Sequence, residues 1–251
     1  MEGYTCCAVP LPGVSVSCGA TTMIITIDGP AGTGKSTVAQ AVARELDFDF
    51  LDTGAMYRAI GLAALRRQIP LEDARELTYV AKLSRIRFDY STQPPGVLLN
   101  DEPVGHLLRG SEATRAASYV AVVPAIREML VEQQRQIGRE HGHLVTEGRD
   151  QGSVVFPDAR LKFYLDATPE ERAMRRVSQL RARGEIVDYQ EILNGIVSRD
   201  RRDASRSVGP LAIPVDAVTI DTTHITQGEV IQQIVDRARQ MIGAGAQGAA
   251  S

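Results

Sequence analysis

Five short apolar segments recur along the chain and predict the strands of one sheet. They are rich in apolar or β-branched residues and lie at about 23–28, 48–51, 143–147, 161–166 and 217–221. Between them, apolar residues recur at intervals of three and four, which is the period of an amphipathic helix. Because parallel strands are joined by crossovers of one hand, this alternation predicts an α/β fold, a five-stranded parallel sheet with helices on both faces.

Start signals define several of the predicted helices. Pro124 favours the first turn of a long helix through Arg139, and Thr168-Pro169-Glu170-Glu171 has the residues of a capping box. Thr226 is the expected cap of the last helix. The other predicted helices cover 38–46, 55–67, 71–83 and 111–122, and one begins at Tyr189.

The region from about 84 to 120 begins with a different pattern. Segments 86–90 and 96–100 read as strands across Gln93-Pro94-Pro95-Gly96, which has the composition of a turn. A further edge strand is expected within 101–104. Because such a run of strands does not fit a simple α/β alternation, we predict a small β-rich insertion at about 84–120 within one domain that spans 23–242.

The two ends of the chain lack the pattern of the core. The first 22 residues contain no lysine or arginine and hold all three cysteines, Cys6, Cys7 and Cys18. A secretory signal needs a basic start and a longer apolar run, so we expect a cytoplasmic protein. Residues 1–22 are then a flexible extension, or a segment that is not translated if Met23 is the true start. Residues 243–251 are of low complexity and are expected to be disordered.

Composition excludes some partners. The formal net charge is −3, the sequence is 43% hydrophobic, and no apolar run is as long as a membrane span. Since there is no basic tail either, we expect no membrane and no nucleic acid polymer as a partner. Lysine occurs only at 35, 82 and 162, and all other basic residues except the histidines are arginine. Arginine suits phosphorylated ligands through its planar fork, but a GC-rich genome explains the same bias.

The strongest local motif joins the first predicted strand to the first helix. It reads Gly29-x-x-x-x-Gly34-Lys35-Ser36, a glycine-rich loop whose backbone N–H groups can wrap a phosphate at the positive end of a helix. Lys35 should reach the β- and γ-phosphates of a nucleoside triphosphate, and Ser36 should bind Mg²⁺. The predicted ATP-binding residues are Gly29, Pro30, Ala31, Gly32, Thr33, Gly34, Lys35, Ser36, Thr37 and, further along the chain, Arg175.

Polar residues follow two other predicted strands. Asp52 and Thr53 come directly after the second strand, and Gly148-Arg149-Asp150 follows the third. The carboxyl ends of the strands are where ligands bind in open α/β sheets. Asp52 and Thr53 would also serve simply as helix caps, but a cap does not account for Arg58, a phosphate-binding type of residue one turn into the next helix.

Several motifs together resemble the bacterial-type cytidylate kinase family. They occupy 28–37, 51–58, 147–150 with 154–159, and 199–203, and their order and spacing agree with that family from about Met23 to Gln240. The first motif alone would indicate only the P-loop superfamily, whereas the second and third are specific. The predicted β-rich insertion is similar to the enlarged monophosphate-binding segment of the family.

This resemblance implies transfer of the γ-phosphoryl group of ATP to CMP or dCMP, with Mg²⁺ as cofactor and a monomeric enzyme. The catalytic residues it implies are Lys35, Arg58, Arg149 and Arg199. Arg58 and Arg149 should hold the acceptor phosphate, while Ser118, Arg127 and Asp150 should read cytosine. The implied CMP-binding residues are Thr53, Arg58, Ser118, Arg127, Arg149, Asp150, Arg199, Asp203 and Arg206, of which the last three approach the ribose and the rest of the acceptor nucleotide.

The segment from about 175 to 188 is the expected lid, with Arg183-Gly184 as its flexible point. For Arg172, Arg181 and Arg183, a solvated basic helix face is an equal alternative. The chain departs from the family at Gln151 and Ser153, where an aliphatic residue and threonine are more usual, and we expect no loss of activity from this.

Three other functions compete with the cytidylate kinase interpretation. The nearest is another small-molecule kinase on the same scaffold, acting on UMP, AMP or shikimate, which would leave the carboxylate of Asp150 without its cytosine partner. A nucleotide-binding regulator is disfavoured because the chain has no Asn-Lys-x-Asp guanine signature. A catalytically inactive binding module is disfavoured by the presence of Lys35 and Ser36.

Overall fold

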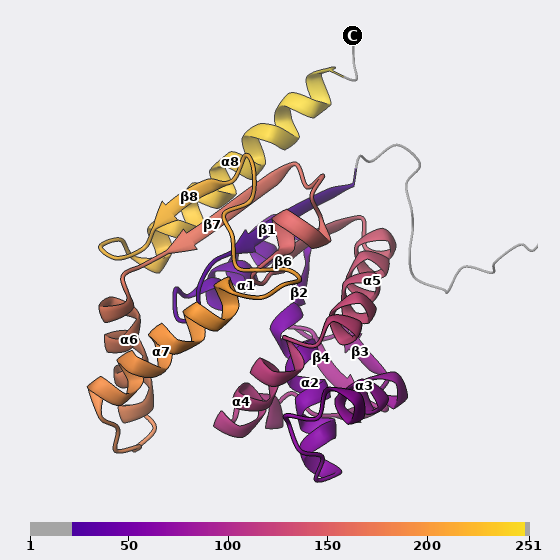
Figure 1. Ribbon diagram of the computed structural model, residues 1–251. Coiled ribbons are helices and arrows are strands. Elements are labelled where there is room, and N and C mark those ends of the chain that lie inside the picture. The colour runs from indigo at the N-terminus through magenta and orange to yellow at the C-terminus, as the bar shows by residue number, and fades with distance from the viewer. Residues whose placement is uncertain (1–21, 249–251) are drawn as a thin grey trace, which may run out of the picture.

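The computed structural model describes residues 22–248, and the expectations for 1–21 and 249–251 lie outside this range. Five parallel strands form the main sheet in the order β2-β6-β1-β7-β8 (Figure 1). Their bounds are β1 Met23–Asp28, β2 Asp49–Asp52, β6 His143–Glu147, β7 Leu161–Asp166 and β8 Val218–Asp221. The predicted α/β fold is confirmed, with strand limits within one residue of those expected.

The two faces of the sheet pack into separate cores. Successive strand residues point to opposite sides, so that Leu51 and Leu144 lie in one core while Phe50 and Val145 lie in the other. Helices α1 Lys35–Leu46 and α8 Gln227–Gly248 cover the face of Phe50 and Val145. Helices α2 Thr53–Arg66, α3 Ala74–Leu83 and α5 Pro124–Glu140 belong to the other core.

Several helix ends differ from the predicted ones for local reasons. α3 begins at Ala74 rather than near 71 because Asp73 caps it, accepting from the backbone N–H groups of Arg75 and Glu76 at 3.0 Å. α8 continues to Gly248, so residues 243–248 are helical, in contrast to the disordered tail expected there. At the start of α8, Thr226 and Glu229 form the reciprocal bonds of a capping box.

The β-rich insertion forms a small antiparallel sheet beside α2 and α3. It consists of β3 Ile86–Asp89, β4 Gly96–Leu99 and the two-residue β5 Glu102–Pro103, followed by the 3₁₀ turn η1 Leu107–Arg109 and α4 Ser111–Val120. Val97 and Leu99 bury their side chains in the same core as α2. Figure 1 shows that the insertion lies on one side of the carboxyl edge of the main sheet.

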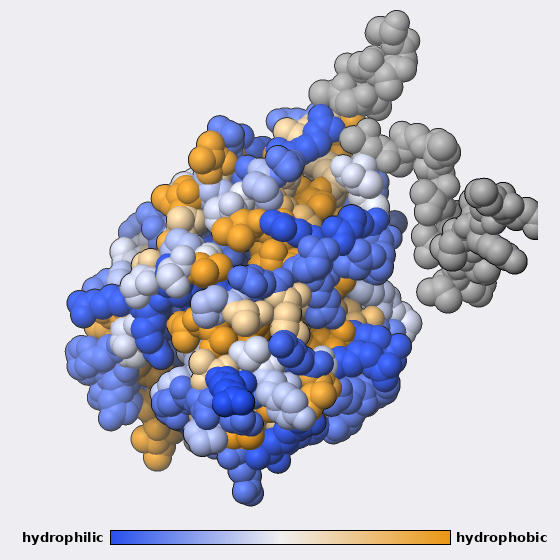
Figure 2. All heavy atoms as spheres, turned by 45° about the vertical axis from the view of Figure 1, so that its right-hand side comes forward, coloured by the Kyte–Doolittle hydropathy of each residue, from blue (hydrophilic) through white to orange (hydrophobic). Residues whose placement is uncertain are grey.

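A helical hairpin stands on the other side of that edge. It is built from α6 Pro169–Arg181 and α7 Tyr189–Ala204, and the connection includes Gly184 with a left-handed φ of 80° (Figure 1). The predicted lid corresponds to the distal part of this hairpin. Hydrophilic and hydrophobic residues are interspersed over the face shown in Figure 2. Among the described residues, no helix is both long and apolar enough to span a bilayer.

Candidate active site

A cleft of about 980 Å³ opens at the carboxyl edge of the sheet, between the insertion and the α6–α7 hairpin. Strand ends, the N-terminus of α1 and both flanking units contribute to its walls. Gly29 and Pro30 are not among the lining residues. Of the site residues predicted from sequence, the cleft is lined by Ala31, Gly32, Thr33, Gly34, Lys35, Ser36, Thr37, Thr53, Arg58, Ser118, Arg127, Arg149, Asp150, Arg175, Arg199, Asp203 and Arg206.

The loop between β1 and α1 has the backbone of a phosphate cradle. Gly29, Gly32 and Gly34 have φ values of 144°, 87° and 88°, which side-chain-bearing residues rarely adopt. Gly29 also packs so closely on the Leu165 carbonyl that a Cβ would collide with it. Since α1 begins at Lys35, its unpaired N–H groups face the loop and favour an anion there.

Lys35 lies folded onto this loop. Its Nζ donates to the Pro30 carbonyl at 2.6 Å and lies 3.5 Å from Thr33 Oγ1, and the residue is only 5% exposed. Burial, assisted by the positive charge of Arg149, lowers the pKa of Lys35 to about 7. A bound phosphate would replace the carbonyl partner and favour the charged form of the ammonium.

Ser36 lies beside a carboxylate that sequence reasoning did not assign. Its Oγ donates to Glu147 Oε1 at 2.7 Å, and Thr53 Oγ1 donates to the Glu147 carbonyl at 2.7 Å. Glu147 ends β6 and is buried, which raises its pKa against the opposing effect of Lys35. A hydroxyl and a carboxylate next to a phosphate site are the hard oxygen donors that Mg²⁺ prefers, so the residues present fit that ion. The sequence feature that could have indicated this role of Glu147 is an acidic residue at the end of a predicted core strand.

Arg58 reaches the cleft from the second turn of α2. Its Nη2 bonds Asp52 Oδ2 at 2.7 Å, and Asp52 Oδ1 also accepts from the Ala55 backbone N–H at 2.8 Å. Asp52 therefore caps α2 and also forms an ion pair with Arg58. The Arg58 side chain is 25% exposed and is accessible to an anion in the cleft.

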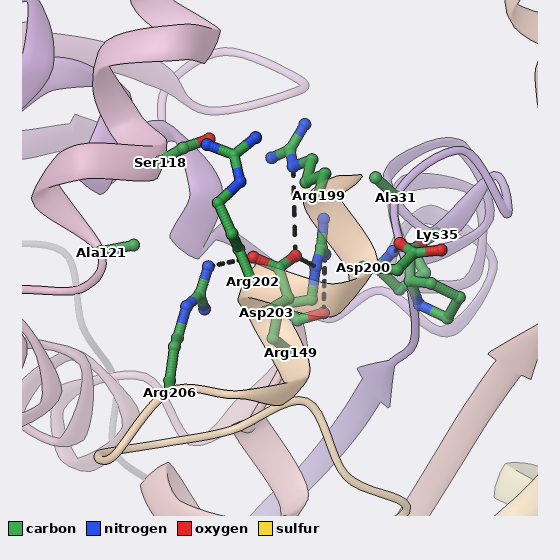
Figure 3. A network of polar contacts seen from close by, with 12 residues as sticks. Ala31, Lys35, Ser118, Ala121, Arg149, Arg199, Asp200, Arg202, Asp203 and Arg206 are labelled. Carbon is green, nitrogen blue, oxygen red and sulfur yellow. Dashed lines mark hydrogen bonds and ion pairs between the residues drawn. The ribbon is translucent and has the colours of Figure 1, made fainter. Parts of the chain in front are cut away.

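Asp203 on α7 gathers three arginines around one buried carboxylate (Figure 3). Arg149 Nε donates to Oδ2 at 3.0 Å, Arg206 pairs with Oδ1, and Arg199 Nε lies 4.0 Å from Oδ2. Burial alone would raise the pKa of Asp203, but these arginines outweigh it and hold the pKa below its usual value. Burial and the nearby Arg149 lower the pKa of Arg199 to about 10. The cluster carries a net positive charge that suits an anionic ligand.

A second buried ion pair joins Arg127 of α5 to Asp150, which follows β6. Their side chains are 2% and 6% exposed, and Arg127 also lies over the Tyr57 ring at 5.7 Å from its centroid. Burial raises the pKa of Asp150, although Arg127 opposes the shift. Ser118 of α4 lines the same cleft, and its Oγ donates to the Thr114 carbonyl at 3.4 Å. The residues predicted to read a base therefore line one cleft, which they reach from α4, α5 and the loop after β6.

Asp28 anchors the segment that carries Asp150. Its two carboxylate oxygens accept from the backbone N–H groups of Gln151 and Gly152 at 2.8 and 2.7 Å, at the start of the π-helical turn η2 Gln151–Val155. Asp28 is fully buried, and this burial raises its pKa to about 7. Asp28 is the first residue of the motif at 28–37, but the sequence alone did not indicate a role for it. The structure shows it tying that loop to the loop after β6.

The arginines of α6 divide into two groups. Arg175 donates to Glu171 at 2.9 Å and to Thr222 Oγ1 at 3.1 Å, at the rim of the cleft. Arg172 is buried between α6, α7 and the P-loop, so the interpretation of this residue as part of a solvated basic face is wrong. Arg181 and Arg183 are exposed, as that interpretation requires.

Comparison with known proteins gives one family. The family model described as cytidylate kinase matches residues 25–240. The cytidylate kinase of Caldanaerobacter subterraneus subsp. tengcongensis is 45% identical over 219 residues, which are 87% of this chain and 96% of that protein. The cytidylate kinase of Salinibacter ruber is 41% identical over 227 residues, covering 89% of this chain and all of that protein.

A longer relative contains the same region. A bifunctional pantoate ligase/cytidylate kinase from Synechococcus sp. is 49% identical over 222 residues, which are 87% of this chain but 41% of that protein. The chain therefore spans about two fifths of the length of this relative.

Proposed function

The chain belongs to the cytidylate kinase family, and we propose that it transfers the γ-phosphoryl group of ATP to CMP or dCMP, giving ADP and CDP or dCDP. The observation that carries the proposal is the buried Arg127–Asp150 pair, which faces the same cleft as the P-loop. One end of the cleft offers a phosphate cradle, and the other offers donors and an acceptor for a base. Arg58, Arg149 and Arg199 line the same cleft.

On the donor side, the loop N–H groups and Lys35 bind the phosphates of ATP. Ser36 and Glu147 would hold Mg²⁺, which supplies positive charge that neutralises the phosphate oxygens. Phosphoryl transfer is catalysed mainly by positioning and charge neutralisation. The acceptor phosphate is largely doubly ionised at neutral pH, since its second pKa is about 6, so its oxygen attacks without a strong protein base.

On the acceptor side, Arg58 and Arg149 hold the phosphate of CMP in line with the γ-phosphoryl group. Both guanidinium groups already have a carboxylate partner, Asp52 and Asp203, which fixes their orientation before substrate arrives. Arg199 lines the same cleft near Arg149 and stabilises the negative charge that develops on the phosphate oxygens during transfer. Asp203 and Arg206 approach the ribose, where a carboxylate can accept a hydroxyl hydrogen.

The base is read by hydrogen-bond polarity. The Asp150 carboxylate accepts from the amino group of cytosine, and Arg127 and Ser118 donate to its ring acceptors. Uracil carries an oxygen where cytosine has the amino group, so it would place two acceptors against each other. UMP and shikimate kinases remain weaker alternatives because neither acceptor offers an amino donor to Asp150, and an AMP kinase does so because adenine has an amino group but lacks the ring carbonyl of cytosine. We further propose that the enzyme is a cytoplasmic monomer.

The test of this function is an ADP-release assay with ATP and Mg²⁺. CMP, dCMP, UMP, AMP, GMP and shikimate are supplied in turn, beside a reaction without acceptor. We expect strong turnover with CMP and dCMP and little with the others. Equal turnover with UMP would refute the assignment of the base readers, and ADP release without any acceptor would refute the kinase function.

Replacing Glu147 with glutamine should raise the Mg²⁺ concentration that gives half-maximal activity by about tenfold or more. Glutamine keeps the hydrogen bond from Ser36 but removes the charge that attracts the ion. The measurement is a Mg²⁺ titration of CMP phosphorylation at fixed ATP, with the exposed Glu45→Gln variant as control. An unchanged Mg²⁺ requirement would show that Glu147 does not hold the ion.

A further inference from the structure

The guanidinium group of Arg172 is buried where three segments meet. Its Nε donates to the Ala167 carbonyl at 3.0 Å, its Nη1 donates to the Ala31 carbonyl at 3.0 Å, and its Nη2 lies 2.7 Å from Asp200 Oδ2. The side chain is only 3% exposed. Arg172 lines the cleft, but each of its three nitrogens already has a protein acceptor and the side chain is almost fully buried, so its contacts are mainly with the protein.

The stem of Arg172 also packs against the P-loop. A Cβ added at Gly32, whose φ is 87°, would lie 3.2 Å from Arg172 Cβ, which leaves little space between loop and helix. The first turn of α6 therefore contacts the loop by packing at Gly32 and by a hydrogen bond at Ala31. A displacement of α6 would carry the loop with it.

The other end of the contact lies on α7, the helix that carries Arg199 and Asp203. Asp200 lies on α7 directly after Arg199 and about one turn before Asp203. Asp200 Oδ1 is buried and has no hydrogen-bond partner among the described residues, so Arg172 is its main compensation. In Figure 3, Asp200 is drawn on the side of Lys35, while dashed lines join Asp203 to Arg149, Arg199 and Arg206.

These contacts link the two halves of the cleft through one buried pair. The P-loop sets the position of the donor phosphates, and α7 sets the position of Arg199. In-line transfer needs reacting atoms about 3–3.5 Å apart, and a misplacement of about 1 Å can cost on the order of 10²-fold in rate. The distance between P-loop and α7 is therefore a quantity that the enzyme must hold constant.

We propose that Arg172 and Asp200 form a positioning pair that fixes α7, and with it Arg199, against the P-loop during phosphoryl transfer. The proposal rests on the kinase function given above. Arg172 acts through Arg199 and not on the nucleotide. Its loss should lower kcat while leaving the KM values for both nucleotides nearly unchanged.

The first experiment compares Arg172→Met, Arg172→Lys and Asp200→Asn with the wild-type chain. We expect kcat to fall by about 30–100-fold in Arg172→Met and by less in Arg172→Lys, with both KM values within about threefold of wild type. Asp200→Asn keeps the side-chain shape but removes its charge, and its kcat should fall by about tenfold. The exposed Arg237→Met on α8 is the matched control, and far-ultraviolet circular dichroism checks that each variant is folded.

The second experiment is a double-mutant cycle with Arg199→Met. If Arg172 acts through Arg199, the kcat of the double variant should be less than about threefold below that of Arg199→Met alone. Full additivity of the two losses, or a raised KM for ATP at unchanged kcat, would overturn the proposal. A wild-type chain that does not phosphorylate CMP would refute the kinase function instead, whereas an active wild type with an equally active Arg172→Met would refute only the positioning role.

Discussion

Lys35→Met is expected to lower kcat for CMP phosphorylation by on the order of 10³-fold or more. Lys35 is the only lysine lining the cleft, among the described residues, and the β- and γ-phosphates have no other ammonium donor there. Methionine retains most of the buried stem and removes only the charged head. The folded structure should therefore persist, because Nζ contributes bonds to the P-loop itself and to no other element.

The measurement is steady-state turnover with saturating ATP and CMP, beside thermal unfolding of each variant. Lys82 of α3 is exposed and supplies the matched control as Lys82→Met, which should behave as wild type. A Lys35→Met enzyme that keeps turnover within tenfold of wild type, at equal stability, would contradict the role assigned to the ammonium group.

The same residue predicts a pH dependence of donor binding. Since burial lowers the pKa of Lys35 to about 7, the ammonium increasingly loses its proton above that pH when no phosphate is bound. A polyphosphate binds the charged form, so binding takes up a proton and the affinity for ATP should fall as pH rises from 7 to 9. Titration calorimetry in two buffers of different ionisation enthalpy measures this uptake. Uptake that persists unchanged in Lys35→Met would place the titration on another group.

Local features of the site were predictable from the sequence, and contacts between distant segments were not. The glycine-rich loop, its strand and its helix are contiguous, so spacing and backbone chemistry sufficed. The pair formed by Ser36 and Glu147 joins residues 111 positions apart, and only the parallel pairing of β1 with β6 brings them together. The strand order is what makes a terminal glutamate of one strand a neighbour of the loop after another.

Arg172 shows the same limit for a charged residue. In the sequence it is one of several arginines on a helix, and a solvated face is the ordinary expectation for such a run. Its burial depends on α7 packing across α6, which places Asp200 within reach. Arg181 and Arg183, farther along the same segment, extend beyond this contact and remain exposed. Tertiary packing, and not residue type, separates the positioning arginine from the solvated ones.

Asp150→Asn should change which pyrimidine nucleotide the enzyme prefers. Asparagine has nearly the shape of aspartate and can still accept a hydrogen bond from Arg127, but it replaces one acceptor with an amide donor. That donor opposes the amino group of cytosine and suits the corresponding oxygen of uracil. We expect kcat/KM for CMP to fall by about 10²-fold, for UMP to be unchanged or rise, and hence the CMP/UMP ratio to fall by at least that factor.

The choice of asparagine follows from the burial of the ion pair. Asp150→Ala should also hurt CMP more than UMP, but it leaves the buried Arg127 without its carboxylate, and breaking such a pair costs about 3–5 kcal/mol of stability. A loss of folded enzyme would then be mixed with the change in preference. The ratio of two substrates measured on one preparation cancels the folded fraction, and thermal unfolding reports the stability separately.

The exposed Asp158→Asn, in the segment that follows the same strand, is the matched control and should keep the wild-type ratio. If Asp150→Asn also keeps that ratio while its overall activity falls, Asp150 supports the fold or orients Arg127 without touching the base. Cytosine would then have to be recognised by Ser118 and Arg127 alone. Since both are donors to ring acceptors that uracil shares in part, such an enzyme should already accept UMP in its wild-type form, so the two measurements must agree with each other.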